Sequence, residues 1–437
     1  MSDKMKLKGL LSRNQVASEH GGRVYLLVQV TAPDRPAARQ GGTAGAASGG
    51  GAGSGPGSGK RLPLNLAAVL DRSGSMQGAK LAYTQKAMSF LVDQVDKKDV
   101  LALVAYDDQV EVVQRAARVR NKDLLKGQVQ ALRAGGMTNL SGGLTAGARE
   151  ARRNAGKGLV NRVLLMTDGL ANQGVTSSEG LVAMAARLRD EGVLLTTLGV
   201  GDTFDEDLLT AMAEAGGGNF YYIENPDRIP AIFSQELQGL LAVAGQSLAL
   251  RVRSSQGVRI EGVLGYPPTW GPGSVELDLP DIYAGETKSL VLELSVAPGS
   301  PGRVSLADVE LVYEDALNGS GEVRLSLDLP FERVPLEALP DEPENPEVMR
   351  EASLAWSSLA VDEAIREADA RHYERSSQVL EETIAALSPM ADDEAVAGQI
   401  EMLRERVEEL RSGQYEASSR KHLRAMSHQN RSGRRHQ

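Results

Sequence analysis

The chain has 437 residues, 41% hydrophobic and 24% charged, with no cysteine and a formal net charge of −10 at pH 7. This composition is typical of a globular protein with room for two or three domains, and the missing cysteine excludes disulfides, zinc–thiolate sites and thiol catalysis. The negative charge argues against a general nucleic-acid binder.

The N-terminal segment, residues 1–38, is expected to supply β-strands. Residues 23–32 are rich in β-branched and aromatic side chains and predict a strand, and residues 6–11 are a candidate for an earlier one. No apolar run approaches the ~20 residues needed to cross a bilayer, and residues 1–11 lack the long apolar core of a signal peptide. We therefore expect a cytoplasmic protein. Residues 39–60 are mostly Gly, Ala and Ser, and they predict a flexible linker.

Residues 61–245 alternate strand and helix patterns, which is typical of an α/β domain. Predicted strands end at Asp71, Tyr106, Met166, Val200 and Ile223, and residues 110–113 are expected to pair antiparallel with the strand before them. Predicted helices lie at residues 80–95, 123–132, 140–154, 178–190, 205–215 and 226–244. Mostly parallel strands with helices on both faces predict a doubly wound, Rossmann-like sheet.

The periodicity changes after residue 245. Residues 246–335 alternate apolar and polar side chains in short runs separated by Gly and Pro, which predicts an antiparallel β-sandwich. The strand at residues 23–32 has no partner nearby in the sequence. We therefore expect it to join this sandwich, so that the α/β domain is inserted between the two parts of the sandwich.

The C-terminal part is expected to be α-helical. Residues 346–416 place apolar side chains on one helical face at a four–three spacing, which predicts a helical hairpin or small bundle. Residues 417–437 contain several Arg and Lys and no acidic residue. They predict a disordered basic tail, either solvated or bound to an acidic partner.

Oxygen donors follow three predicted elements of the α/β domain. Asp71, Ser73 and Ser75 follow the first strand, Thr138 lies in a glycine-rich loop, and Asp168 follows a buried strand. Open α/β sheets bind ligands at the carboxyl ends of their strands. Carboxylate and hydroxyl oxygens suit a hard cation such as Mg²⁺. Because hydroxyl ligands are neutral, the metal would stay positive and attract an anion, which indicates recognition rather than hydrolysis.

This set resembles the von Willebrand factor type A family and its metal-ion-dependent adhesion site, whose pattern is Asp-x-Ser-x-Ser, a Thr on a second loop and an Asp on a third. The resemblance implies that Ser73, Ser75 and Thr138 ligate Mg²⁺, with Mn²⁺ or Ca²⁺ as alternatives. Asp71 and Asp168 would act nearby, at least one through water, and an Asp or Glu of a partner protein would complete the coordination. The flanking segments resemble bacterial multi-domain members of the family and, more loosely, the inter-alpha-trypsin inhibitor heavy chains.

Three functions follow as hypotheses. The first is a non-enzymatic, Mg²⁺-dependent protein-binding scaffold in a bacterial cell; the second is a metal-dependent hydrolase or phosphotransferase using the same loops. Against the second, the α/β domain contains no histidine for a Ser-His-Asp triad and no second acidic cluster for a two-metal centre. The third is a vestigial site, with function residing in the sandwich or tail. Asp71 and the two serines could also simply cap the following helix.

Overall fold

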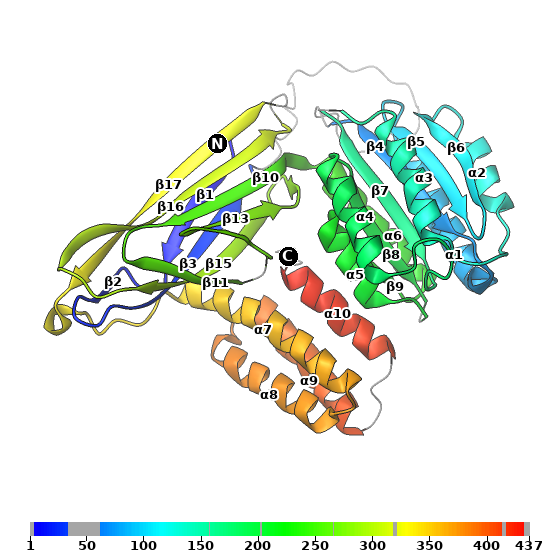
Figure 1. Ribbon diagram of the computed structural model, residues 1–437. Coiled ribbons are helices and arrows are strands. Elements are labelled where there is room, and N and C mark those ends of the chain that lie inside the picture. Colours follow the sequence, from blue (N-terminus) through cyan, green and yellow to red (C-terminus); the bar gives the residue numbers. More distant parts are fainter. Residues whose placement is uncertain are drawn as a thin grey trace, which may run out of the picture.

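The chain forms an α/β domain, a β-sandwich and a group of C-terminal helices that contact one another (Figure 1). The computed structural model describes residues 4–33, 62–156, 158–201, 203–264, 266–317, 321–412 and 417–431. The linker predicted for residues 39–60 lies outside these described residues. Among the described helices, none is both long and apolar enough to span a membrane.

The α/β domain is built on a six-stranded sheet with strand order β6-β5-β4-β7-β8-β9. All neighbours are parallel except β5 and β6, which form the predicted antiparallel pair. Every residue of β4 is buried, because its apolar run faces helices on both sides. The strands are β4 (Leu64–Asp71), β5 (Val100–Tyr106), β6 (Val110–Arg118), β7 (Val160–Thr167), β8 (Leu194–Val200) and β9 (Gly217–Ile223).

Helices cover both faces of this sheet, as the sequence predicted. One core joins the sheet to α1, α2 and α6, and a second core joins its other face to α3, α4 and α5. The helices are α1 (Ala79–Gln94), α2 (Lys122–Ala131), α3 (Leu140–Arg152), α4 (Ser178–Asp190), α5 (Glu206–Ala215) and α6 (Ile229–Leu241). The sheet is therefore doubly wound.

The β-sandwich consists of two sheets around one apolar core. The smaller sheet has the order β1-β3-β15-β11; the larger has the order β12-β13-β10-β16-β17-β2, and β14 also pairs with β10. The strands are β1 (Lys6–Leu11), β2 (Gln15–Ala17), β3 (Gly22–Thr31), β10 (Val243–Ser254), β11 (Val258–Leu264), β12 (Thr269–Gly271), β13 (Ser274–Leu279), β14 (Ile282–Tyr283), β15 (Thr287–Val296), β16 (Gly302–Asp315) and β17 (Glu322–Val334).

The N-terminal strand joins the sandwich, which confirms the expected insertion of the α/β domain. β3 lies between β1 and β15 and is antiparallel to both, with Gly22 opposite Val296 and Thr31 opposite Thr287. The chain leaves the sandwich after β3, forms the α/β domain, and re-enters through β10 directly after α6. The short strand β2, which runs parallel to β17, was not predicted.

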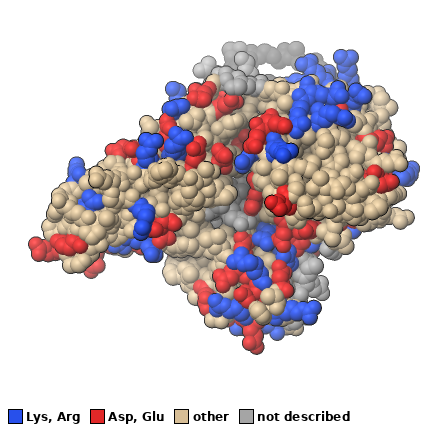
Figure 2. Space-filling model, viewed as in Figure 1, with Lys and Arg blue, Asp and Glu red and all other residues tan. Residues whose placement is uncertain are grey.

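The C-terminal helices are α7 (Pro346–Asp369), α8 (Tyr373–Leu387), α9 (Glu394–Ser412) and α10 (Ala417–Arg431). The first three form the predicted bundle around their own apolar core. The start of α7 packs on the sandwich, where Trp356 meets Tyr25 edge-on with 5.2 Å between ring centroids. Figure 2 shows both signs of charge side by side over the bundle, in keeping with ion pairs such as Arg350–Asp393 (2.7 Å).

The expectation of a disordered basic tail at residues 417–437 is wrong for residues 417–431, which form α10. This helix contacts α5, β9 and α7 (Figure 1). Its basic side chains Arg420, Lys421 and Arg424 pair with acidic side chains of α5 and α7. For these residues the acidic partner is the chain itself. Residues 432–437 lie outside the described part of the chain.

Candidate metal site

The first loop of the site begins where β4 ends, near the middle of the sheet. Asp71 is fully buried there. Its Oδ1 accepts a hydrogen bond from the Ser73 backbone N–H (2.8 Å), and its Oδ2 accepts one from the Thr167 hydroxyl at the end of β7 (2.6 Å). Burial, the largest cause, raises the pKa of Asp71 above its ordinary value of 3.8. The fold therefore orients this carboxylate but disfavours its charge.

The helix-capping interpretation of this loop is wrong. The N-cap of α1 is Gly78, with no side-chain cap. Ser73 precedes a 3₁₀ helix (η1, Gly74–Met76), but its side chain makes no capping hydrogen bond. Instead the Ser73 and Ser75 hydroxyls lie 3.2 Å apart, and Ser75 Oγ donates to Asp168 Oδ1 at 2.8 Å. The serine hydroxyls thus face each other and the third loop.

The second loop presents Thr138, whose side chain is buried. The Thr138 backbone N–H donates to Asn172 Oδ1 (2.7 Å), and the Thr138 carbonyl accepts from the Asn172 N–H (3.1 Å). Backbone bonds also tie this loop to the first one, from Gly74 N–H to the Gly136 carbonyl (3.0 Å) and from Gly135 N–H to the Arg72 carbonyl (2.9 Å). The backbone therefore holds Thr138 in place independently of its hydroxyl.

The three loops come together beside Gly169. A Cβ built on Gly169 would lie 3.4 Å from Ser75 Oγ and 3.5 Å from Thr138 Oγ1. Both hydroxyls therefore lie within ordinary contact distance of the same point beside Gly169. All five residues singled out in the sequence, Asp71, Ser73, Ser75, Thr138 and Asp168, lie on these loops, and each is buried except Ser75.

Tyr106, at the end of β5, brings a buried hydroxyl to the same place. Its register partner on β4 is Asp71. The Tyr106 side chain is fully buried, and its hydroxyl lies beside the Thr167 and Asp71 side chains. Burial, and after it the nearby Asp71 charge, raise the pKa of Tyr106 well above its ordinary value.

Lys80, in the first turn of α1, is the cation of the site. Its Nζ donates to Asp168 Oδ2 at 2.6 Å and to the Thr203 hydroxyl at 3.0 Å. Thr203 Oγ1 in turn donates to the Asp168 backbone carbonyl at 2.7 Å. Sequence reasoning missed Lys80, Thr203 and Tyr106. The position of Lys80 five residues after the last serine was the one signal that could have revealed it.

The donor set fits a hard divalent cation. Within the described residues, no group of three or more His, Cys, Asp or Glu side chains could hold a metal. The converging groups are instead hydroxyls supported by buried carboxylates, and such oxygen donors suit Mg²⁺ rather than a soft metal. Ser73, Ser75 and Thr138 are the residues that would hold it.

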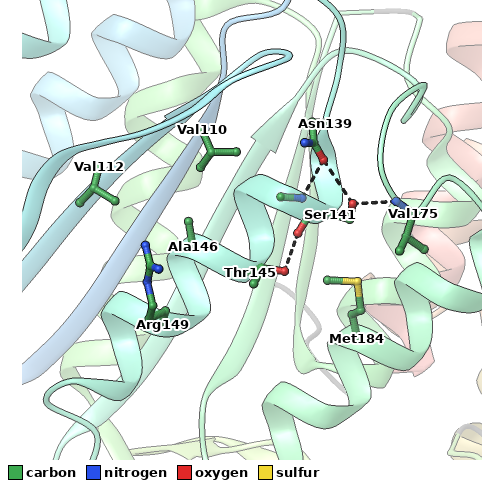
Figure 3. Close-up of a pocket in the computed structure, with 10 residues that line it drawn as sticks. Val110, Val112, Asn139, Ser141, Thr145, Ala146, Arg149, Val175 and Met184 are labelled. Atoms are coloured by element: carbon green, nitrogen blue, oxygen red, sulfur yellow. Dashed lines mark hydrogen bonds between the residues drawn. The ribbon is translucent and has the colours of Figure 1, made fainter.

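A hollow of about 380 Å³ lies beside the second loop (Figure 3). Val110 and Val112 of β6 line one side, Val175 and Met184 line the other, and α3 lies between them. The other lining residues belong to α3 and its N-cap: Asn139, Ser141, Gly142, Thr145, Ala146 and Arg149. Since Asn139 follows Thr138, the hollow adjoins the converging loops.

Comparison with known proteins now identifies the α/β domain. Residues 65–235 match the family model of the von Willebrand factor type A (VWA) domain. The chain contains a VWA domain. VWA domains commonly mediate protein–protein interaction or adhesion, are typically non-enzymatic and often bind a divalent metal. The family resemblance inferred from the motif is thereby confirmed.

Relatives of the VWA-containing chain include two uncharacterized bacterial proteins. It is 29% identical over 60% of its length to sll0103 of Synechocystis sp., and 28% identical over 43% to YfbK of Escherichia coli. The matches span 64% and 33% of those proteins, less than two thirds of each. Human inter-alpha-trypsin inhibitor heavy chain H6 is 26% identical over 34% of the chain and 12% of its own length.

Two solved structures share the fold of nearly the whole chain. A von Willebrand factor type A protein from Catenulispora acidiphila has a TM-score of 0.69 at 17% identity, covering 92% of this chain and 89% of its own. The ArnB paralog VWA2 from Sulfolobus acidocaldarius has a TM-score of 0.63 at 16% identity, covering 98% and 99%. At these identities the likeness establishes the fold alone.

Proposed function

We propose that the VWA domain binds Mg²⁺ at Ser73, Ser75 and Thr138 and uses the metal to capture an Asp or Glu carboxylate of a protein partner. One observation carries this proposal: the Ser75 and Thr138 hydroxyls, which come from two different loops, approach the same point beside Gly169, at 3.4 and 3.5 Å. Mn²⁺ and Ca²⁺ offer the same preference for oxygen ligands. In this proposal the protein is a non-enzymatic scaffold, and its location is cytoplasmic.

The charges around the three loops favour an incoming anion. The hydroxyl ligands are neutral, and the two nearby carboxylates are already engaged by Thr167, Ser75 and Lys80. A bound divalent cation supplies a positive charge that these partly satisfied carboxylates do not cancel. A partner's carboxylate is then attracted by this positive charge and takes a coordination position on the metal. The chain's own donor set thus supports the proposed recognition of an acidic residue.

Hydrolysis by a Ser-His-Asp triad finds no support at this site. The five histidines are at positions 20, 372, 422, 428 and 436, all outside residues 61–245. α10 does bring His422 to the VWA domain, where its ring lies 5.4 Å from that of Tyr222. Tyr222 belongs to the edge strand β9, which β8 separates from β7 and Asp168. His422 therefore lies at another part of the sheet.

The hollow beside Thr138 supports a protein partner rather than a free small acid. Its walls include Val110 and Val175, which are 37% and 42% exposed and available for apolar contact. Arg149 contributes a positive charge to the same hollow. A partner segment with an apolar residue near its metal-binding carboxylate would bury these side chains, and burial contributes about 25 cal/mol per Å² of apolar surface.

Affinity capture tests the proposal. Wild type, Asp71→Ala and a control, Asp93→Ala, are immobilised and exposed to cell extract with Mg²⁺. Asp93 lies near the C-terminal end of α1, is half-exposed and pairs with Lys126 of α2. The control therefore removes a carboxylate that lies outside the three loops. Proteins should bind wild type and Asp93→Ala, leave when a chelator is added, and not bind Asp71→Ala. Identical capture by all three proteins, unaffected by chelator, would rule the function out.

A further inference from the structure

Lys80 forms an ion pair with Asp168, and this ion pair bears on metal binding. Asp168 is fully buried, and its two carboxylate oxygens are both engaged: Oδ1 accepts from Ser75 Oγ at 2.8 Å, and Oδ2 from Lys80 Nζ at 2.6 Å. The Asp168 side chain is 0% exposed and that of Lys80 is 26% exposed, so the ion pair is shielded from water on the carboxylate side. A buried carboxylate with a close ammonium needs no other cation for its charge.

The position of the ammonium is built into the fold. A Cβ on Gly201, which has a φ of +71°, would lie 2.9 Å from Lys80 Cε, so the lysine stem passes where a side chain would otherwise be. The Thr203 hydroxyl accepts from Lys80 Nζ and donates to the Asp168 carbonyl. Lys80 is therefore bound by the loop after β7 and by the segment after β8. Both contacts distinguish it from a freely moving surface lysine.

We propose that Lys80 is the resident counter-ion of Asp168, that it competes with the divalent metal, and that it sets the metal concentration at which the site fills. The inference rests on the proposed metal-binding function. In the metal-free protein, the Lys80 ammonium offsets the negative charge of Asp168. The metal therefore meets a weaker negative field and competes with an ammonium for Asp168.

A purely structural ion pair makes the opposite prediction for metal affinity. If Lys80 only fastened α1 to the third loop, its removal would loosen the loop and weaken both stability and Mg²⁺ binding. If Lys80 competes with the metal, its removal destabilises only the metal-free protein and tightens Mg²⁺ binding. Metal affinity and metal-free stability therefore change in opposite directions under the proposal and together under the alternative.

Lys80→Met tests this difference, because methionine keeps an apolar stem and removes the charge. Thr203→Val is the second variant: it removes an acceptor of the ammonium while preserving side-chain shape. Lys126→Met is the matched control, since Lys126 also forms an ion pair, with Asp93, outside the three loops. Circular dichroism checks folding. Calorimetric titration gives Mg²⁺ affinity, and thermal melts with and without Mg²⁺ give stability.

We expect Lys80→Met to bind Mg²⁺ roughly tenfold more tightly than wild type, the size expected for one nearby charge in a partly screened site. Its melting temperature should fall without metal and rise more on adding Mg²⁺. Thr203→Val should show a smaller change in the same direction, and Lys126→Met none. Equal or weaker binding by Lys80→Met, with binding intact in wild type, overturns the role of Lys80 alone. If neither protein binds Mg²⁺, both this inference and the proposed function fail.

Discussion

Lys421 of α10 lies over the ring of Phe204, with Nζ 4.5 Å from the ring centroid. The same ammonium donates to the Phe204 carbonyl at 3.2 Å and to Glu206 Oε2 at 2.7 Å. Phe204 directly follows Thr203, whose hydroxyl bonds the Asp168 carbonyl. The C-terminal helix therefore contacts the segment that borders the candidate metal site, although helix and segment are over 200 residues apart in the sequence.

Arg420→Ala should weaken the attachment of α10. Arg420 forms ion pairs of 2.6 Å with Glu206 and Asp207 of the VWA domain and with Asp369 of α7. These carboxylates, the Asp369 hydrogen bond first, raise the pKa of Arg420 far above its ordinary value. Alanine leaves them without this partner, so we expect a loss of about 2 kcal/mol, a few degrees in melting temperature. Hydrogen exchange should also quicken in α10.

The exposed Arg404 on α9 supplies the control for that experiment, because Arg404→Ala removes an equal charge outside the α10 contact. High salt should narrow the difference between Arg420→Ala and wild type, since screening weakens ion pairs. Equal melting temperatures and equal exchange in α10 for wild type and Arg420→Ala would show that these ion pairs do not hold the helix.

Thr138→Ala should weaken Mg²⁺ binding about tenfold, the effect of losing one direct oxygen ligand of a hard cation. The loop should keep its conformation because Asn172 holds the Thr138 backbone at both its N–H and its carbonyl. Calorimetry measures the affinity and circular dichroism the fold. Thr145→Ala, on α3 outside the converging loops, is the matched control. Unchanged affinity in Thr138→Ala would remove the second loop from the site.

Asp71 predicts a pH dependence of stability. Its folded pKa is raised above 3.8 by burial, so the metal-free folded chain holds this proton more tightly than the unfolded chain does. This contribution to the free energy of unfolding is fully present below the unfolded pKa of Asp71 and is lost as pH rises through its folded pKa. Asp71→Asn removes this contribution. Its metal-free melting temperature should therefore fall less than that of wild type as pH rises.

Bound Mg²⁺ reverses the direction of this pH dependence, because the metal favours the ionised carboxylate and its binding releases a proton. Mg²⁺ affinity of wild type should therefore increase with pH across the same range. Melting curves recorded with and without Mg²⁺ at a series of pH values check both statements. Parallel pH profiles for wild type and Asp71→Asn without metal would show that Asp71 does not titrate as its burial predicts.

Removal of the N-terminal strand β3 should expose the apolar core of the sandwich. β3 lies in the interior of its sheet, so a chain starting at residue 62 would leave β15 with an unpaired edge and would open the apolar core that includes Val24, Leu26 and Val28. Unpaired edges and apolar strips favour aggregation. Size-exclusion chromatography should show aggregates for residues 62–437. A monomeric fragment with full strand content would contradict the importance of this pairing.

The convergence of the first and third loops could be predicted because Asp71 and Asp168 lie at strand ends. Asp71 and Asp168 each come directly after a buried apolar run, and parallel strands bring such ends to one edge. Lys80 was missed because a lysine in the first turn of a helix is ordinarily solvated. Its contacts with Gly201 and Thr203 show where its ammonium is held.

The sandwich could likewise be predicted, since alternating side chains reveal a half-buried strand and residues 23–32 lacked a local partner. The basic tail was misjudged for a different reason. Arg420, Lys421 and Arg424 lie on one side of a helix, which was a usable signal. Their partners Glu206 and Asp207 are distant in sequence, however, and no local pattern pairs charges across such a separation.

Calorimetric titration of Mg²⁺ into metal-free wild type and Asp71→Ala tests the central claim most directly. Asp71 is fully buried and oriented by Ser73 and Thr167, so its loss should disrupt the first loop's support for the metal. The account predicts one binding site per chain in wild type and affinity at least about tenfold weaker in Asp71→Ala, provided the variant is folded by circular dichroism. Equal Mg²⁺ affinity in the two proteins, or no binding by wild type, would contradict it.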